Sequence, residues 1–206
     1  MSSDSTHWIL TLVCPDQPGI VHAVSGAIVQ ADGNITESQQ FSSEDTGTFF
    51  MRLQVETGAG REEFEAALAP VVERYGMDWQ LDVVGRPLRT LVLVSKAAHC
   101  LNDLLFRQRA GHLPVEIPLV LANHPDLGEL AAFYGVPFES HPVTNPDEKA
   151  AFERRVLEAV DEHRIELVVL ARYMQILSPE LCEALAGRVI NIHHSFLPGF
   201  KGANPY

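Results

Sequence analysis

The chain has 206 residues, 46% of them hydrophobic and 20% charged, and a formal net charge of -12 at pH 7. This length suits one large domain or two small ones, and no apolar run approaches the roughly 20 residues of a membrane-spanning helix. The acidic balance argues against nucleic acid or an anionic membrane surface as a partner.

Neither the N-terminal residues nor the cysteines indicate a secreted protein. The start, MSSDSTHW, lacks the basic and apolar regions of a signal peptide. The three cysteines, Cys14, Cys100 and Cys182, are odd in number and far apart, which is typical of reduced thiols rather than a disulfide framework or a zinc site. We therefore expect a cytoplasmic protein.

The first part of the chain predicts a small module of two helices and four strands. Alternating or continuous apolar residues mark the strands, and an apolar stripe from Ile20 to Ala31 marks the first helix. We expect Gly33 to end that helix in the left-handed conformation. The expected elements are strand 7–14, a helix from residue 20, half-buried strand 35–42, a hairpin turn at 44–47, strand 48–56, helix 58–76 and strand 77–84.

This βαββαβ order is the ferredoxin-like, split βαβ arrangement. With PDQPGI after the first strand and GNI after the first helix, residues 1–84 resemble an ACT domain. The resemblance implies pairing between copies and binding of a small effector, often an amino acid. It makes Asp16, Gly19, Ile20 and Asn34 effector-site candidates, while a plain tight turn and a plain helix stop remain the alternatives.

A second pattern of residues follows the polar, proline-containing segment 85–90, which we interpret as a linker. Continuous apolar strands alternate with helices from residue 91 to 206, which indicates an open, mostly parallel, doubly wound sheet. Ligands of such sheets bind at the carboxyl ends of the strands. Three segments are expected there: residues 122–123, 171–177 and 191–194.

The residues of those segments carry a second resemblance. INIHHSFLPGFKGANPY is similar to the signature of the folate-dependent formyltransferase fold, and LARYMQIL is similar to its folate-binding loop. Behind an ACT-like module, the combination resembles the formyltetrahydrofolate deformylase family. That resemblance implies hydrolysis of 10-formyltetrahydrofolate to formate and tetrahydrofolate, which supplies formate for purine biosynthesis and balances one-carbon folate pools.

Asn191 and His193 are the catalytic candidates. Hydrolysis of an N-formyl group passes through a tetrahedral oxyanion, and the Asn191 amide is a donor suited to it. Alternate strand residues share a face, so His193 joins Asn191 and can pass a proton to the leaving amine. His194 points away and is a supporting residue or a second substrate contact.

The resemblance implies that Met174, Gln175, Ile176 and Leu177 hold the pterin ring, with a buried turn as the alternative. Asn123 contacts the formyl or pterin region, or caps the turn NHPD. We expect no metal site, because adjacent strand residues diverge and no carboxylate or cysteine stands at ligand spacing to the two histidines. We expect no cofactor either, since 10-formyltetrahydrofolate is the substrate.

Water is the expected acceptor of the formyl group. A phosphorylated amine acceptor requires a glycine-rich turn after the first strand of the sheet, and VLVSKAAHCLNDLL has no glycine. Relatives of this fold carry a catalytic aspartate on a later segment, which we expect beyond Tyr206, so the catalytic domain is expected to be incomplete and its activity reduced. The alternatives are formyl transfer to an amine, or an inactive ACT-linked folate-binding regulator.

Overall fold

The structure is a computed structural model that describes residues 6–192. The chain forms two compact units, Met1–Arg86 and Pro87–Tyr206. The second unit begins its sheet at Leu88, inside the segment that the sequence assigned to a linker. The Leu88 N–H donates to Pro114 O over 3.0 Å, and the Arg89 guanidinium binds the Glu116 carboxylate at 2.8 Å, so these residues belong to the sheet.

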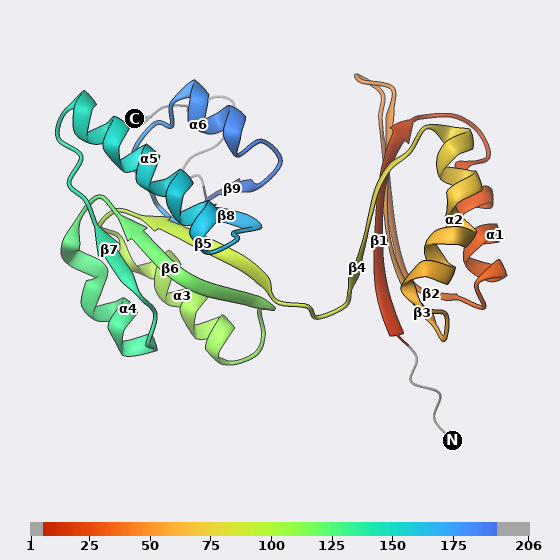
Figure 1. The fold of residues 1–206 in the computed structure, drawn as a ribbon, viewed down its shortest axis with the longest axis horizontal. Coiled ribbons are helices and arrows are strands. Elements are labelled where there is room, and N and C mark those ends of the chain that lie inside the picture. Colours follow the sequence, from red (N-terminus) through yellow and green to blue (C-terminus); the bar gives the residue numbers. More distant parts are fainter. Residues whose placement is uncertain (1–5, 193–206) are drawn as a thin grey trace. The chain divides into compact units, whose positions relative to one another are not determined.

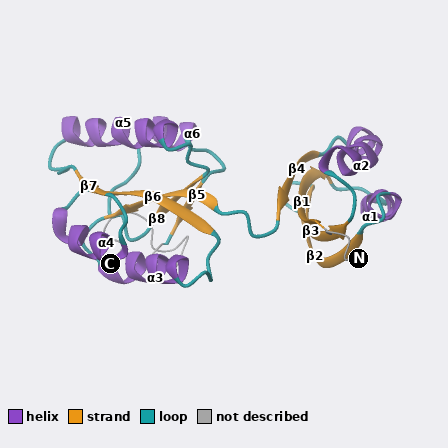
Figure 2. Cartoon of the chain, turned by 60° about the horizontal axis from the view of Figure 1, so that its bottom comes forward, coloured by secondary structure: helices purple, strands orange, loops and turns teal. Residues whose placement is uncertain are grey.

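The first unit has the βαββαβ order that the sequence predicted (Figure 1). Its antiparallel sheet has the order β2-β3-β1-β4, and α1 and α2 pack on one face over a single apolar core (Figure 2). The elements are β1 (Thr6–Pro15), α1 (Ile20–Gln30), β2 (Asn34–Ser43), β3 (Thr48–Thr57), α2 (Arg61–Tyr75) and β4 (Asp78–Val83).

Two local predictions in this unit were wrong. The left-handed residue after α1 is Asp32, with φ 49°, and not Gly33. Glycine is needed at position 33 for space, since an added Cβ would lie 2.8 Å from Ile28 Cγ2 and 2.9 Å from Ile28 O. Strand β2 is not half-buried: it is the edge strand, and none of its residues is buried.

The second unit is a doubly wound sheet with the order β7-β6-β5-β8-β9, in which every pair of neighbouring strands within residues 88–192 is parallel. Helices α5 and α6 cover one face, and α3 and α4 cover the other (Figure 2). The elements are β5 (Leu88–Val94), α3 (Ala98–Arg109), β6 (Val115–Ala122), a 3-10 turn η1 (Pro125–Leu127), α4 (Gly128–Tyr134), β7 (Phe138–Ser140), α5 (Pro146–Glu162), β8 (Leu167–Leu170), α6 (Pro179–Ala184) and β9 (Val189–Asn191).

Alternating strand residues divide between two cores in this unit. Leu91 and Leu93 of β5 face α5, whereas Val92 and Val94 face α3, and all four are fully buried. Burial on both faces explains why the strands are continuously apolar rather than alternating.

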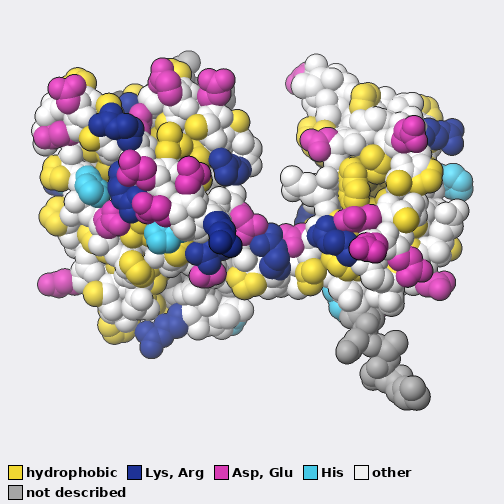
Figure 3. Space-filling view, in the orientation of Figure 1, with side chains coloured by type: hydrophobic (Ala, Val, Ile, Leu, Met, Phe, Trp, Pro, Cys, Tyr) yellow, Lys and Arg dark blue, Asp and Glu magenta, His cyan; other side chains and the backbone are white. Residues whose placement is uncertain are grey.

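No helix within residues 6–192 is long and apolar enough to cross a membrane. Acidic and basic side chains are interspersed on the face drawn in Figure 3. Some of the surface charge is paired: Arg155 of α5 contacts Glu139 at 2.9 Å and Glu162 at 3.0 Å.

Candidate active site at the carboxyl edge of the parallel sheet

The direction of the strand order reverses at β5, because β6 and β7 lie on one side of it and β8 and β9 on the other. Such a switch point is where open sheets bind ligands. The backbone aligns the strand ends there: Asn123 N donates to Val94 O over 3.4 Å, and Ala171 N donates to Leu93 O over 2.9 Å. The ends of β5, β6 and β8 are therefore neighbours at this edge.

The loop after β8 is fixed at this edge by two hydrogen bonds. Met174 N donates to Ser95 Oγ over 3.0 Å, and Ser178 N donates to Glu153 Oε1 over 3.0 Å. Tyr173, just before the loop, stacks on Phe152 of α5 with ring centroids 5.5 Å apart. Sequence reasoning found the loop but missed Ser95 and Glu153, whose partners lie far away in the chain.

Within the loop, the two aliphatic side chains that were expected to hold a ring behave differently. Ile176 is 64% exposed, whereas Leu177 packs against the core beneath α5 and α6. The side chain of Leu177 thus serves the protein core, and Ile176 is the aliphatic side chain available to a ligand.

Two ionisable groups of this region have shifted pKa values. Burial, and secondarily the Glu153 carboxylate, raise the pKa of the Tyr173 phenol, which stays neutral. Burial alone would raise the pKa of Glu153, but the hydrogen bond from Ser178 and the ammonium of Lys149 outweigh it and lower that pKa. Glu153 is therefore a stable carboxylate, paired with Lys149 Nζ at 3.1 Å.

Asn123 lies at the end of β6 with only 2% of its surface exposed. Its Oδ1 is buried and has no hydrogen-bond partner among the described residues, so this oxygen does not cap the turn NHPD there. Three strand spacings separate β6 from β9, which is roughly 14 Å across the sheet. Asn123 and Asn191 therefore lie well apart along this edge.

Asn191 is the last residue of β9, in register with Leu170, and is exposed. The following amide, Ile192 N, donates to Leu170 O over 3.1 Å, which places Asn191 against β8. Among the described residues β9 pairs with β8 alone. His193 and His194 lie outside the described residues, so their roles stay predictions.

Arg172 is a further residue of this edge that the sequence did not single out. Its backbone is left-handed, with φ 60°, a conformation that non-glycine residues seldom adopt. Its Nε is buried and has no hydrogen-bond partner among residues 6–192. Burial raises the pKa of the Cys100 thiol on α3, and the positive charge of Arg172 opposes that shift.

The four effector candidates of the first unit do not form one site within a single copy. Asp16 N donates to Gly47 O at one end of the β2–β3 hairpin, whereas Asn34 pairs with Glu56 at the other end, roughly 26 Å away. Ile20 is 2% exposed and belongs to the core. Gly19, with φ 95°, lines a hollow of about 460 Å³ between α1 and α2.

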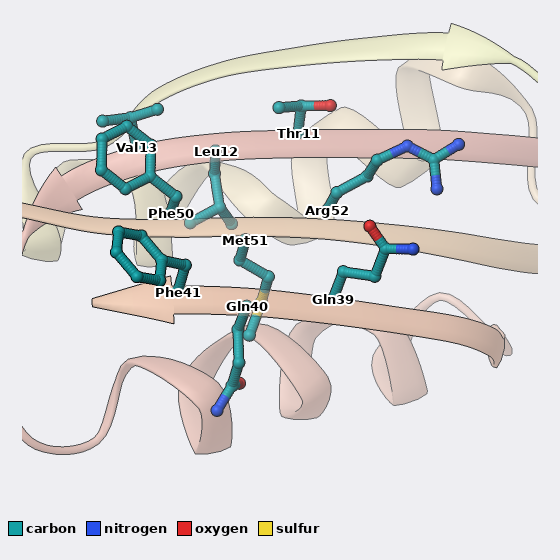
Figure 4. A pocket seen from close by; sticks show the side chains of 9 residues that line it. All are labelled: Thr11, Leu12, Val13, Gln39, Gln40, Phe41, Phe50, Met51 and Arg52. Atoms are coloured by element: carbon teal, nitrogen blue, oxygen red, sulfur yellow. The ribbon is translucent and has the colours of Figure 1, made fainter. Parts of the chain in front are cut away.

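A second hollow of the first unit, about 310 Å³, lies over β1, β2 and β3 (Figure 4). Val13, Phe41 and Phe50 gather at one end, and Gln39 and Arg52 lie at the other. None of the effector candidates lines this hollow. In residues 6–192 no group of three or more His, Cys, Asp or Glu side chains is placed to hold a metal ion.

Comparison with known proteins matches both units. The ACT domain family matches residues 8–69, and the formyl transferase family matches residues 88–206. A formyltetrahydrofolate deformylase of Corynebacterium sp. (strain P-1) is 44% identical over 207 residues, which cover 99% of this chain and 72% of that protein.

Solved structures agree. The formyltetrahydrofolate deformylase of Burkholderia mallei ATCC 23344 superposes with a TM-score of 0.86 at 41% identity, covering 97% of this chain and 71% of that one. Glycinamide ribonucleotide transformylase 1 of Geobacillus kaustophilus matches with a TM-score of 0.51 at 29% identity, covering 57% of this chain and 63% of that one.

The fold and the carboxyl-edge site thus define an ACT unit followed by a folate-type formyl transferase unit. The combination of both units, matched along nearly the whole chain, is shared by a smaller group of proteins than either unit alone. The chain belongs to the formyltetrahydrofolate deformylase family.

Proposed function

We propose that this chain catalyses the hydrolysis of 10-formyltetrahydrofolate to formate and tetrahydrofolate, a hydrolase reaction at a C–N bond. In the cell it supplies formate for purine biosynthesis and balances one-carbon folate pools. One observation carries the proposal: both units match a formyltetrahydrofolate deformylase together, at 44% identity over 99% of the chain.

In the proposed reaction, water adds to the formyl carbon and generates a tetrahedral oxyanion. The C–N bond then breaks, the amine nitrogen of tetrahydrofolate takes a proton, and formate leaves. Asn191 donates a hydrogen bond to the oxyanion, a contribution of about 2.7–4 kcal/mol. His193 delivers the proton to the amine. Water and the folate supply every atom of the products, so the reaction as proposed uses no resident cofactor.

The folate lies along the loop between β8 and α6 in this proposal. The main chain of Met174 to Leu177 meets the donors and acceptors of the pterin ring, and the exposed Ile176 covers an apolar face of it. The buried Oδ1 of Asn123, which has no hydrogen-bond partner among residues 6–192, accepts a hydrogen bond from the substrate. His194 is a further substrate contact.

Formyl transfer to an amine is the competing reaction within this fold. The turn between β5 and α3, residues 95–97, contains no glycine. Side chains therefore crowd the place where backbone amides would have to approach an anionic amine acceptor, which supports water as the acceptor.

The test is formate release from 10-formyltetrahydrofolate by the protein at its natural length. We expect Asn191→Ala to lower kcat about 10²–10³-fold and His193→Ala about 10²–10⁴-fold. Ile190→Val, beside Asn191 but on the opposite face of β9, is the control and keeps full activity. Equal rates in all three variants would show that Asn191 and His193 are not catalytic residues. Tight folate binding without formate release would favour a folate-binding regulator.

The first unit is proposed to bind a small effector, an amino acid, and to pair with another copy. The hollow beside Gly19 and the exposed edge strand β2 support these two roles. Light scattering should show a homo-oligomer, and Gly19→Val should abolish any thermal shift produced by amino acids. We also propose a cytoplasmic location, where the folate substrate is made and used.

A further inference from the structure

The loop between β8 and α6 is held at both of its ends by side chains from other elements. Ser95, after β5, accepts the Met174 N–H, and Glu153, on α5, accepts the Ser178 N–H. Between these two hydrogen bonds, residues 175–177 form neither helix nor strand. The position of their main chain is thus set by the two anchored ends and by Leu177, whose side chain packs against the core.

Glu153 is an unusual residue for the place it occupies. It lies on the buried side of α5, with 9% of the residue and 11% of its side chain exposed. A buried carboxylate is costly unless it is paired and hydrogen-bonded. Here Lys149, one turn earlier, supplies the opposite charge at 3.1 Å, and Ser178 supplies the hydrogen bond.

The start of α6 does not require this carboxylate. Ser178 is the N-cap of α6, and its own hydroxyl accepts the Leu181 N–H over 3.1 Å. What Glu153 adds is a fixed position for the Ser178 amide, and with it the last residue of the loop. Ser95, which is 5% exposed, does the same at the Met174 amide.

We propose that Glu153, charged and oriented by Lys149, and Ser95 are positioning residues that hold the main chain of Gln175 to Leu177 in the conformation that receives the pterin ring. This proposal rests on the proposed folate function. Neither residue touches the reacting atoms, so their effect falls on substrate binding: a preformed loop spares the substrate the cost of ordering it.

The test uses two independent variants, Glu153→Ala and Ser95→Ala, and a conservative one, Glu153→Gln, which keeps an acceptor oxygen. Glu158→Ala is the matched control, because Glu158 lies on the same helix, its side chain is 62% exposed, and its ion pair with Arg155 is 3.8 Å long. The assays are the KM and kcat of formate release, tetrahydrofolate binding by calorimetry, and hydrogen exchange at the Ser178 and Met174 amides.

A hydrogen bond to a charged group predicts that Glu153→Ala raises KM and the tetrahydrofolate Kd about 10- to 100-fold, with kcat within about threefold of wild type. Ser95→Ala should raise both about tenfold or less, since its hydrogen bond is neutral. Glu153→Gln should recover most of the loss, and the control should match wild type. Exchange should accelerate at Ser178 in Glu153→Ala and at Met174 in Ser95→Ala.

The outcomes separate the two levels of the proposal. Faster amide exchange with unchanged KM and Kd overturns the positioning role. A loss in kcat alone, or equal losses in Glu158→Ala, also overturns it. If wild type binds tetrahydrofolate but releases no formate, the hydrolase proposal fails, and the Kd values still decide the positioning role. If Glu153→Ala does not fold, Ser95→Ala and Glu153→Gln decide it.

Discussion

Gly33 and Gly26 form a pair of glycines for which the structure predicts opposite effects of the same substitution. A Cβ at position 33 would lie 2.8 Å from Ile28 Cγ2, 2.9 Å from Ile28 O and 3.0 Å from Val55 Cγ1. Ile28 and Val55 are fully buried, so the added methyl must displace core side chains or backbone. Overpacking of this kind costs about 1–3 kcal/mol, which is the destabilisation expected for Gly33→Ala.

Gly26 lies inside α1, and an added Cβ there would meet nothing within 4 Å. Gly26→Ala should therefore stabilise the first unit by about 0.5–1 kcal/mol through helix propensity. Both variants replace one glycine by alanine, at position 26 or at position 33, so their unfolded states are nearly equivalent.

Tryptophan fluorescence measures this difference in the correct unit, because both tryptophans, Trp8 and Trp79, belong to the first unit. With a urea m-value of about 1–2 kcal/mol/M, the midpoint should fall by roughly 1 M in Gly33→Ala and rise by roughly 0.5 M in Gly26→Ala. If Gly33→Ala unfolds at the wild-type midpoint, or if Gly26→Ala loses as much stability as Gly33→Ala, the steric reasoning is refuted.

Two further predictions concern the second unit. The pKa of Glu139 is lowered, chiefly by the hydrogen bond that it accepts from Arg155. Glu139 therefore stabilises the fold above the ordinary carboxyl pKa of about 4.3, and this stabilisation is lost as the pH falls through the lower pKa of the folded state. Urea unfolding followed by circular dichroism should show stability falling less steeply below about pH 4.3 in Arg155→Gln than in wild type, and parallel profiles would contradict this. Ile176→Ser should change the free energy of unfolding by no more than about 0.5 kcal/mol and raise the folate KM about tenfold. The control is Phe106→Ser on α3, where the side chain is 56% exposed compared with 64% for Ile176, and it should leave KM unchanged. An unchanged KM in Ile176→Ser would mean that this side chain does not contact the substrate.

The order of elements could be predicted because each element carries its own signal. The stripe of α1, the continuous strands β5 and β8, and the amphipathic α5 follow from residue spacing, and the structure has all of them. The two units, the parallel doubly wound sheet and the family also follow from motifs in the chain.

Predictions that depended on the surroundings of a residue were less successful. Position 33 needs glycine because Ile28 and Val55 approach it, and Val55 is distant in sequence. Strand β2 alternates like a half-buried strand, but it is the edge of the sheet, where fewer neighbours cover it.

The sequence by itself predicted that residues 122–123, 171–177 and the end of β9 reach the carboxyl edge of the sheet, because continuous apolar strands that alternate with helices indicate parallel strands. It could not determine how those segments are held. The contacts of Met174 with Ser95 and of Ser178 with Glu153 join residues 79 and 25 positions apart. Only the tertiary structure brings such partners within hydrogen-bond distance, because the packing of α5 and β5 around β8 decides which side chains face the loop.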